Sequence, residues 1–327
     1  MDNIEVIEVN HEYSNVSGHF KFHDFEFLCN DATFILQPGE IYDYILVFNK
    51  GTWISGNCPF GIFNHSKWID GTLEYGTFFE SEWVNGVFKD GYFVNSIWDD
   101  GVWEYGSFKD GSLWYKGTWK DGSFDLSKWY DGTFLNGHIV ASEWMNGVFK
   151  NGSIVNSKWY HGVFENGTIK NSKWYSGTFN SGEISNSTWY NGVFNNGSFI
   201  DGDWEFGNWR GGTFSSGRWE LGIWENGTFE GSHWHNGIWR SGIFKESSWY
   251  NGVWCSGNFS GTWISGLFRS GTVKASDFYG GVIEHINVLG ENNFYIYSGN
   301  EESDKKNIEK NIKYLFEKLN KYLVKKE

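Results

Sequence analysis

Residues 157–171 read SKWYHGVFENGTIKN, and residues 172–186 repeat the phrase as SKWYSGTFNSGEISN. In each phrase a large apolar residue recurs every fifth position, with a Gly or Ser two places before it. The same rule runs from Thr52 to Ile283, over most of the 327-residue chain. Such repetition is the signature of a solenoid or of a sheet array, so the length of the chain measures the number of repeats rather than the number of domains.

Each five-residue unit combines a turn with a short extended segment. Asn, Asp or Ser stands two places after most large residues, usually just before Gly or Ser, as in Asn146 and Asn151. Asn-Gly and Asp-Gly pairs favour tight turns because both residues tolerate positive φ. Between turns, residues two apart face the same side. We therefore expect the small and large residues to point inward and the residue between them to face solvent.

The pattern resembles the pentapeptide-repeat family, whose units place a small residue two positions before an inward Leu or Phe and stack as a right-handed four-sided β-helix. This chain departs from that family by using Gly or Ser at the small site and abundant Trp at the large one. A second resemblance is to MORN repeats, whose Gly-x-Trp-x-x-Gly core is matched by residues 51–56, 117–122 and 237–242. MORN units are longer and form antiparallel hairpins, so an antiparallel β-sheet array is the alternative fold.

Two observations disagree on the number of sides in each coil. Ser before Trp recurs every fifteen residues, as at Ser142/Trp144, which suggests a three-sided coil with Trp stacked on Trp. A triangle with sides of about 16 Å and a rise near 4.8 Å, however, encloses roughly 500 Å³, most of it backbone, whereas a four-sided coil encloses about twice that volume. We therefore predict an all-β repeat protein, a right-handed four-sided β-solenoid of about twelve coils.

The five-residue count slips twice. One residue is inserted near Leu113-Trp114 and one is lost before Trp263, while the spacing between small and large residues survives both slips. Each slip predicts a local bulge in one coil.

The chain divides into four predicted regions. Residues 1–50 break the five-residue rule and show period-two alternation, which predicts an N-terminal β cap over the first coil. Residues 51–283 form the solenoid, and residues 284–300 are predicted terminal strands. Residues 301–327 predict a C-terminal amphipathic α-helix, which begins after an N-cap at Ser303-Asp304.

One apolar stripe marks the predicted helix as a docking element. Its residues are Ile308, Ile312, Leu315, Leu319 and Tyr322. We expect the helix to pack over the last coil as a cap; homo-oligomerisation through the helix or the ends, and contact with a membrane surface, are the alternatives.

The charge pattern argues against a nucleic-acid partner. The net charge of −14 divides into −7 for residues 1–50, −7 for the repeat and zero for residues 284–327, so the repeat carries a weak field with no basic patch. Residues Cys29, Cys58 and Cys255 are odd in number and lack metal-like spacing, which predicts reduced thiols. No apolar run could span a membrane and no secretory signal is recognisable, so we expect a cytoplasmic protein.

The sequence predicts no enzyme, cofactor or metal site. His19, His23 and Glu26 lie in a strand-like stretch where a spacing of four does not place them on one face, so zinc binding is not expected. The Trp residues belong to the predicted core. The better ligand candidates are outward tyrosines that follow Trp and form a candidate contact strip: Tyr130, Tyr160, Tyr175, Tyr190 and Tyr250.

The leading functional hypothesis is a non-catalytic repeat scaffold that mediates protein–protein contacts. Its composition is similar to that of repeat proteins of bacteriophages and large DNA viruses, which implies a virus-encoded or virion component. The resemblance to pentapeptide-repeat inhibitors implies an alternative, an acidic DNA mimic that inhibits a topoisomerase. A third hypothesis is a carbohydrate-binding module that uses the tyrosine strip.

Overall fold

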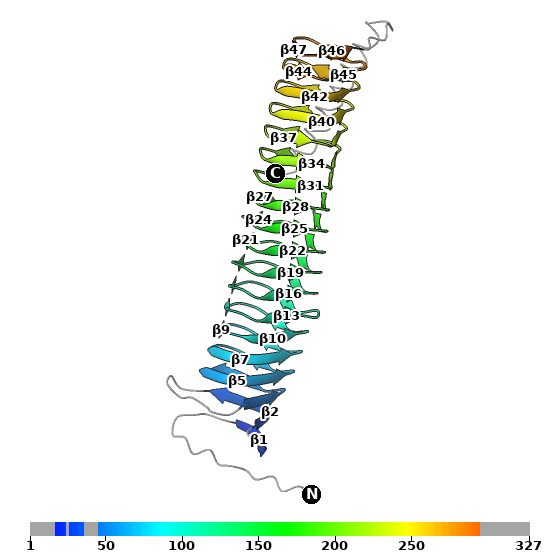
Figure 1. The fold of residues 1–327 in the computed structure, drawn as a ribbon. Coiled ribbons are helices and arrows are strands. Elements are labelled where there is room, and N and C mark those ends of the chain that lie inside the picture. The colour runs from blue at the N-terminus through cyan, green and yellow to red at the C-terminus, as the bar shows by residue number, and fades with distance from the viewer. Residues whose placement is uncertain (1–16, 24–25, 36–44, 295–327) are drawn as a thin grey trace. The chain divides into compact units, whose positions relative to one another are not determined.

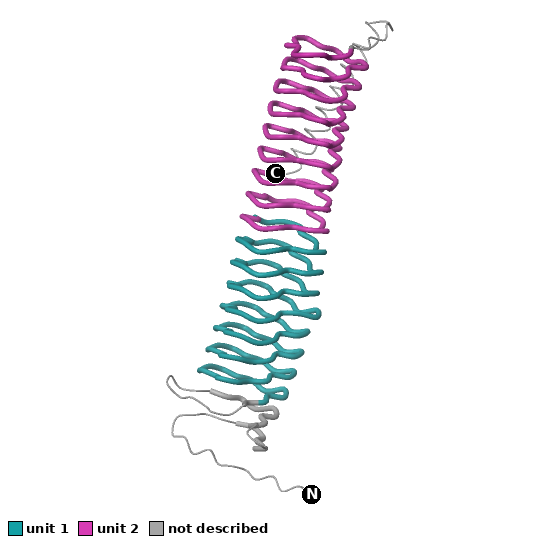
Figure 2. Tube along the Cα trace, in the orientation of Figure 1, with its two compact units in different colours: residues 1–163 teal, residues 164–327 magenta. Residues whose placement is uncertain are grey.

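The computed structural model describes residues 17–23, 26–35 and 45–294. The chain divides into two compact units, residues 1–163 and residues 164–327 (Figure 2). Each unit is a parallel β-solenoid whose successive coils lie one on the next, with about 16 turns in total (Figure 1).

One coil takes fifteen residues and has three sides. In unit 1, Trp129 pairs with Trp144, Phe134 with Phe149 and Ile139 with Ile154, a step of fifteen residues on every side. The four-sided prediction is therefore wrong, and so is its count of twelve coils. Parallel pairing between coils also excludes the MORN-like antiparallel array.

We name the sides by their order along the coil. The first side carries the Ser-x-Trp segments, and the second and third sides follow it along the chain. In unit 1 the first side holds β4 (Thr52–Ser55), β6 (Lys67–Trp68), β8 (Glu82–Trp83), β11 (Ile97–Trp98), β14 (Leu113–Trp114), β17 (Lys128–Trp129), β20 (Glu143–Trp144) and β23 (Lys158–Trp159). The second side holds β9 (Val87–Phe88), β12 (Val102–Trp103), β15 (Thr118–Trp119), β18 (Thr133–Phe134), β21 (Val148–Phe149) and β24 (Val163–Phe164), which contains the boundary between the units. The third side holds β3 (Ile45–Asn49), β10 (Gly91–Val94), β13 (Ser107–Lys109), β16 (Ser123–Asp125), β19 (His138–Val140) and β22 (Ser153–Val155). Two longer strands, β5 (Asn57–Asn64) and β7 (Thr72–Phe79), run through the second and third sides.

Unit 2 repeats the same three sides. Its first side holds β26 (Lys173–Trp174), β29 (Thr188–Trp189), β32 (Asp203–Trp204), β35 (Arg218–Trp219), β38 (His233–Trp234), β45 (Asp277–Phe278) and β48 (Asn293–Phe294). Its second side holds β27 (Thr178–Phe179), β30 (Val193–Phe194), β33 (Asn208–Trp209), β36 (Ile223–Trp224), β39 (Ile238–Trp239), β41 (Val253–Trp254), β43 (Leu267–Phe268) and β46 (Val282–Ile283). Its third side holds β25 (Thr168–Lys170), β28 (Glu183–Ser185), β31 (Ser198–Ile200), β34 (Thr213–Ser215), β37 (Thr228–Glu230), β44 (Thr272–Lys274) and β47 (Asn287–Leu289). The strands β40 (Ile243–Trp249) and β42 (Asn258–Trp263) run from the third side into the first.

The large residues fill the interior, as the five-residue spacing predicts. From Trp53 to Phe278 each of them is at most 2% exposed, and Ile283 is partly exposed. This confirms the inward orientation of the large sites.

Ring geometry explains why the volume argument failed. The Trp129 and Trp144 rings lie 4.7 Å apart and nearly parallel at 4°, whereas Trp129 meets Phe134 of its own coil edge to face at 5.8 Å and 77°. Rings in successive coils therefore form offset stacks at one strand spacing, an arrangement that aromatic quadrupoles favour. Our volume estimate assumed that the side chains of one coil need separate space within that coil. Flat rings instead stack on the rings of the coils above and below, so they fit inside a three-sided coil.

Two corners of each coil depend on glycine. Gly147 has a φ of +115°, and a Cβ at this position would lie 2.5 Å from the carbonyl oxygen of Gly132 in the preceding coil. The preceding Asx side chain often holds the turn, as where Asp131 Oδ1 accepts the N–H of Gly132 at 2.7 Å. These contacts explain the Asn-Gly and Asp-Gly pairs of the sequence.

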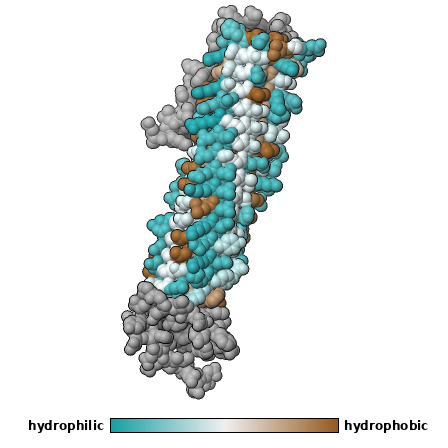
Figure 3. Space-filling model, turned by 60° about the vertical axis from the view of Figure 1, so that its left-hand side comes forward, coloured by the Kyte–Doolittle hydropathy of each residue, from teal (hydrophilic) through white to brown (hydrophobic). Residues whose placement is uncertain are grey.

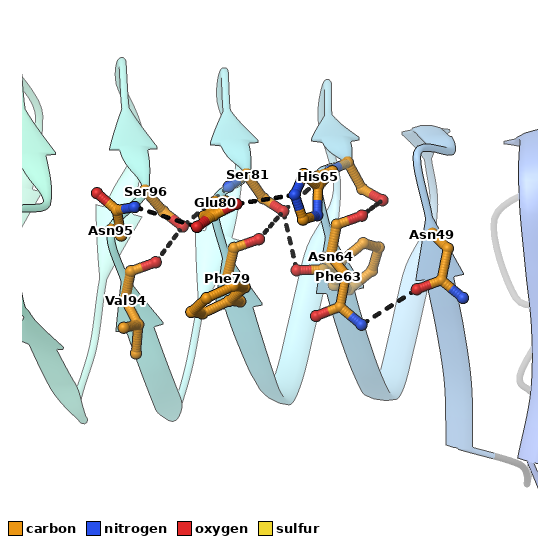
Figure 4. Close-up of polar contacts among 11 residues, drawn as sticks. Asn49, Phe63, Asn64, His65, Phe79, Glu80, Ser81, Val94, Asn95 and Ser96 are labelled. Carbon is orange, nitrogen blue, oxygen red and sulfur yellow. Dashed lines mark hydrogen bonds and ion pairs between the residues drawn. The ribbon is translucent and has the colours of Figure 1, made fainter.

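The third corner, before the first side, is built around a buried serine. The residue before it has positive φ without being glycine in most coils, as for Asn95 at 46°. Ser81 Oγ donates to the carbonyl of Phe79 at 2.8 Å and accepts the N–H of Ser66 in the preceding coil at 3.0 Å (Figure 4). The N–H of Ser81 in turn donates to Ser96 Oγ at 3.0 Å. Repeated from coil to coil, these bonds form a serine ladder along the corner.

The two slips in the count are absorbed at this serine corner. Ile97 pairs with Leu113, a step of sixteen, and Ser112 Oγ reaches back three residues to the carbonyl of Lys109 instead of the usual two. The first slip thus enlarges a corner and leaves the strands regular. At the second slip the ladder between β40 and β42 shifts register between Lys245 and Ser247, which confirms the predicted bulge there.

Further strands precede and follow the repeat along the chain. Near the N-terminus β1 (Ser17–His23) pairs antiparallel with β2 (Glu26–Ile35), which pairs parallel with β3 and β4. In unit 2, β47 and β48 pair parallel with β44 and β45. The described ranges contain no helix, so the predicted C-terminal α-helix is not part of the observed fold; residues 301–327, with their apolar stripe, lie outside those ranges.

Candidate contact surface

The outward residues of successive coils line up in columns because the step of fifteen repeats every side chain position. On the first side of unit 1, Glu143 lies between two lysines of the adjacent coils, with its carboxylate 2.9 Å from Lys158 Nζ and 3.2 Å from Lys128 Nζ. The hydrogen bond from Lys158 lowers the pKa of Glu143, and the hydrogen bond to Glu143 raises the pKa of Lys128. Acids and bases thus alternate in this part of the column.

Unit 2 also carries ion pairs on its outer surface. Arg218 Nε lies 2.9 Å from a Glu220 carboxylate oxygen and 3.5 Å from one of Asp203 in the preceding coil. On the third side Lys245 Nζ contacts the Glu230 carboxylate at 2.6 Å. Exposed pairs of this kind stabilise a protein little, but they neutralise the acids that would otherwise form a negative stripe.

The tyrosine strip of unit 1 lies at the position directly after the Trp column. The Tyr115 and Tyr130 rings stack at 4.8 Å and 6°, and the Lys128 ammonium lies 5.7 Å from the centre of the Tyr130 ring. Met145 occupies the same position in the next coil, followed by Tyr160, because the coils pair Trp129 with Trp144 and Trp144 with Trp159. Tyr130 and Tyr160 are half-buried, whereas Tyr115 is exposed.

The strip of unit 2 follows the same rule and is interrupted. Tyr175 and Tyr190 stack at 4.9 Å and 8°. Glu205 and Glu220 occupy the position in the next two coils, after which His235 stacks on Tyr250 at 4.8 Å and 10°. The five tyrosines from the sequence therefore share one structural position, but they belong to two units and form no single continuous strip.

Sequence reasoning missed two aromatic features of unit 1. Tyr115 belongs to the strip, but the inserted residue near Leu113 shifts it out of the fifteen-residue count; its position directly after Trp114 was the usable signal. Exposed aromatic residues also stand at the corner between the second and third sides, where the Phe60 and Tyr75 rings lie 6.5 Å apart. Partial burial, the charge of nearby Asp90 and contact with Tyr92 raise the pKa of Tyr75.

A shallow groove follows the serine corner in each unit. The groove of unit 1 has a volume of about 610 Å³ and includes His65 and Glu80, whose side chains lie 2.8 Å apart. The groove of unit 2 has a volume of about 560 Å³, and its lining includes Gly202 and Gly217, which stand where most coils have serine. Both grooves are lined mainly by polar residues. On the face shown in Figure 3, hydrophilic residues predominate and hydrophobic ones are interspersed among them.

Within residues 17–23, 26–35 and 45–294 there is no group of three or more His, Cys, Asp or Glu placed to hold a metal ion. The same ranges contain no helix that could cross a bilayer. Cys58 is buried and its thiol donates to the carbonyl of Phe60 at 3.5 Å, whereas Cys255 is a partly exposed free thiol.

No family model, curated protein or solved structure matches this chain.

Proposed function

We propose that this protein is a non-catalytic scaffold that binds a protein partner through its outward aromatic columns. The observation that carries the proposal is a stacked tyrosine pair at one fixed position, with one exposed and one half-buried ring in each pair, Tyr115/Tyr130 in unit 1 and Tyr190/Tyr175 in unit 2. Aromatic side chains fixed in this way lose little conformational entropy on binding and are typical anchors of protein interfaces.

The rigid backbone adds to the argument. Each tyrosine follows a fully buried Trp in a two-residue strand, so its position is fixed by the core rather than by a flexible loop. Anchors held by packed neighbours avoid part of the ordering cost of association. Each stacked pair also presents two tyrosine side chains at one strand spacing, about 4.8 Å.

The two alternative functions fit the surface less well. A DNA mimic needs closely spaced unneutralised acids, whereas Glu143 and Asp203 each lie beside a base from an adjacent coil. A sugar-binding platform needs open aromatic faces, whereas the faces of Tyr115 and Tyr130 are turned toward each other.

Affinity capture from the producing cells tests the proposal. The wild-type chain should retain a protein partner, and the double variant Tyr115→Ser/Tyr130→Ser should retain at least tenfold less of it. Tyr105→Ser removes a tyrosine from another column that is even more exposed than Tyr115, and it serves as the control. Binding of the purified partner should then be measured by calorimetry. Repeated recovery of no partner, or equal binding by both variants, would contradict the proposal.

The cellular setting is a separate part of the proposal. We propose a cytoplasmic protein of the producing cell that belongs to a virus or bacteriophage, on the resemblance of its composition and repetition to such proteins. Its relation to the pentapeptide-repeat family likewise rests on the shared spacing of small and large residues. Mass spectrometry of purified particles from infected cells tests the viral assignment.

A further inference from the structure

Four side chains converge at the corner between the second and third sides of unit 1. Phe60 and Tyr75 occupy this corner in adjacent coils, and their rings lie 6.5 Å apart at an angle of 54°. Tyr92, an outward residue of β10, lies within hydrogen-bonding reach of Tyr75, and the Asp90 carboxylate is close enough to act on Tyr75 electrostatically. Phe60, Tyr75, Asp90 and Tyr92 together form the corner site.

The three rings of the corner site are open to solvent. Phe60 is 50% exposed, Tyr92 is 45% exposed and Tyr75 is 42% exposed. The Phe60 and Tyr75 rings are tilted, whereas the Tyr115 and Tyr130 rings of the first side stack at 6°. Tilted rings do not cover each other's faces, so these π systems are open to a ligand.

The column that contains Asp90 changes its composition within unit 1. In later coils of this column, Asx side chains bond to one another, as where Asn136 Nδ2 donates to Asp121 Oδ2 at 3.0 Å. Asp90 instead has an aromatic residue in both adjacent coils, because the parallel pairing places it between Tyr75 and Tyr105. Asp90 therefore lacks the amide neighbour that Asp121 has.

The charge of Asp90 is not neutralised by a basic side chain. Asp90 Oδ1 accepts the N–H of Gly91 at 2.7 Å, which leaves Oδ2 as the open oxygen. In the part of the chain that the structure describes, no lysine, arginine or histidine forms an ion pair with this carboxylate. Glu74, by contrast, is paired with Lys89 at 2.7 Å in the neighbouring column. The corner site thus holds one unpaired negative charge beside three exposed rings.

Charge complementarity selects a cation as the occupant of the corner site. The Lys109 ammonium lies 5.7 Å from the centre of the Tyr92 ring, so one ring of the site already contacts a cation. An aromatic face attracts a positive charge through its quadrupole, and a nearby carboxylate adds a Coulomb attraction. An anion would be repelled by Asp90.

We propose that the corner site binds a lysine side chain of a partner protein, with the ammonium beside Asp90 Oδ2 and the methylene stem against the rings of Phe60 and Tyr75. Lysine buries its apolar stem along such surfaces while its ammonium stays at the rim. A single open oxygen suits the point charge of an ammonium, whereas the guanidinium of arginine favours two oxygens at once. The site is separate from the tyrosine strip, so this inference does not rest on the function proposed above.

Fluorine NMR of the full chain labelled with 3-fluorotyrosine tests the proposal. The probe is the peptide acetyl-Ser-Gly-Lys-Gly-Ser-amide, and the matched control peptide has Gln in place of Lys. The Lys peptide should shift the resonances of Tyr75 and Tyr92, which the variants Tyr75→Phe and Tyr92→Phe assign. The Gln peptide should shift neither resonance at the same concentration. Equal shifts with both peptides, or shifts with neither, would overturn the proposal.

Two variants with the same loss of charge separate the corner site from the general acidity of the chain. Asp90→Asn should weaken binding of the Lys peptide about two- to fivefold. The turn should survive, because Asn226 accepts the N–H of Gly227 at 2.8 Å at the same corner of another coil. Asp121→Asn removes an acid from the same column and should leave the affinity unchanged. An equal loss of affinity in both variants would mean that the peptide senses only net charge, and the proposal would fall.

Two further comparisons identify the occupant and keep the site apart from the tyrosine strip. In Tyr115→Ser/Tyr130→Ser the Lys peptide should bind as it does to the wild type, so that the corner site and the proposed scaffold function are tested independently. Loss of peptide binding in this double variant would overturn the assignment to the corner. Tetramethylammonium is the probe for a small ammonium ligand. Shifts of Tyr75 and Tyr92 with this ion, without shifts with the Lys peptide, would overturn lysine as the occupant.

Discussion

The serine ladder gives the sharpest prediction, because one serine hydroxyl closes the third corner in most coils. In the wild type, Ser142 Oγ donates to the carbonyl of Val140 at 2.8 Å and accepts the N–H of Ser127 at 3.1 Å. Ser142 itself is 3% exposed. Replacing it by alanine leaves the Ser127 N–H buried without an acceptor, which costs about 1–3 kcal/mol.

Hydrogen exchange is the appropriate assay, because a solenoid can unfold in parts and a single unfolding free energy is then poorly defined. In Ser142→Ala the Ser127 amide should lose about 5- to 150-fold of its protection, the factor that corresponds to about 1–3 kcal/mol. The matched control is Ser153→Ala, in the same coil. Its hydroxyl bonds to the exposed His138 ring at 2.7 Å, so we expect a change within about 0.5 kcal/mol.

The two variants together separate the ladder from a general effect of losing a hydroxyl. If Ser127 keeps its wild-type protection in Ser142→Ala, or if both variants change it equally, the serine corner is not held by this bond. The explanation that these corners need serine for its hydroxyl group, and not only for its small size, would then be refuted.

The remaining predictions concern the core, a corner and an ion pair. Trp129→Ala should lower the opening free energy of its own coil by about 3–5 kcal/mol in hydrogen exchange, because it removes a fully buried ring from its stack; a loss below about 1 kcal/mol would contradict the packed interior. Gly147→Ala should destabilise unit 1 by more than about 1 kcal/mol in thermal unfolding, because its Cβ would meet a backbone oxygen and φ is positive there. Gly231→Asn should leave the stability unchanged in the same assay, because Gly231 has a φ of +56° and open space around it. The pKa of Glu143 is lowered, so its ion pairs stabilise the folded chain at a pH above the ordinary value of 4.5, and this contribution is lost as the pH falls through the lowered pKa. Glu143→Gln should therefore make the free energy of unfolding depend less on pH in the acid range. An unchanged pH dependence would refute the ion pairs.

The sequence predicted the inward residues well because the chemistry of five residues is local. A Gly or Ser two positions before a large residue, followed by an Asx turn, sets the direction of each side chain without reference to the rest of the fold. Trp129, Phe134 and Ile139 are accordingly all buried. The number of sides depends on how three such units close, which is a property of packing between coils.

The number of sides in each coil was nevertheless encoded in the sequence. Serine before Trp every fifteen residues marks the same corner in each coil, and we set this signal aside for a volume estimate that ignored stacking. The role of Ser142 in the ladder was also missed, because serine was treated as a small residue equivalent to glycine. Its restriction to one small site in three was the signal that distinguishes a hydrogen-bonding position from a merely small one.

The outer surface was harder to predict because an outward position says nothing about what covers it. Tyr130 and Tyr160 lie in one column directly after Trp, but Met145 stands between them, so the strip is not continuous as the spacing suggested. Val253 has the sequence context of any outward residue and is buried. It packs with Leu221 and Leu267 of other coils, and a five-residue pattern does not describe such contacts.

Disulfide trapping tests the three-sided coil most directly. Lys128 and Glu143 are paired neighbours on adjacent strands, and strands about 4.8 Å apart lie within the Cα separation that a disulfide accepts. The account predicts rapid oxidation of Lys128→Cys/Glu143→Cys to an intrachain disulfide and none in Lys128→Cys/Val148→Cys. Formation of the second disulfide instead of the first would mean a coil of twenty residues with four sides, and the fold described here would be wrong.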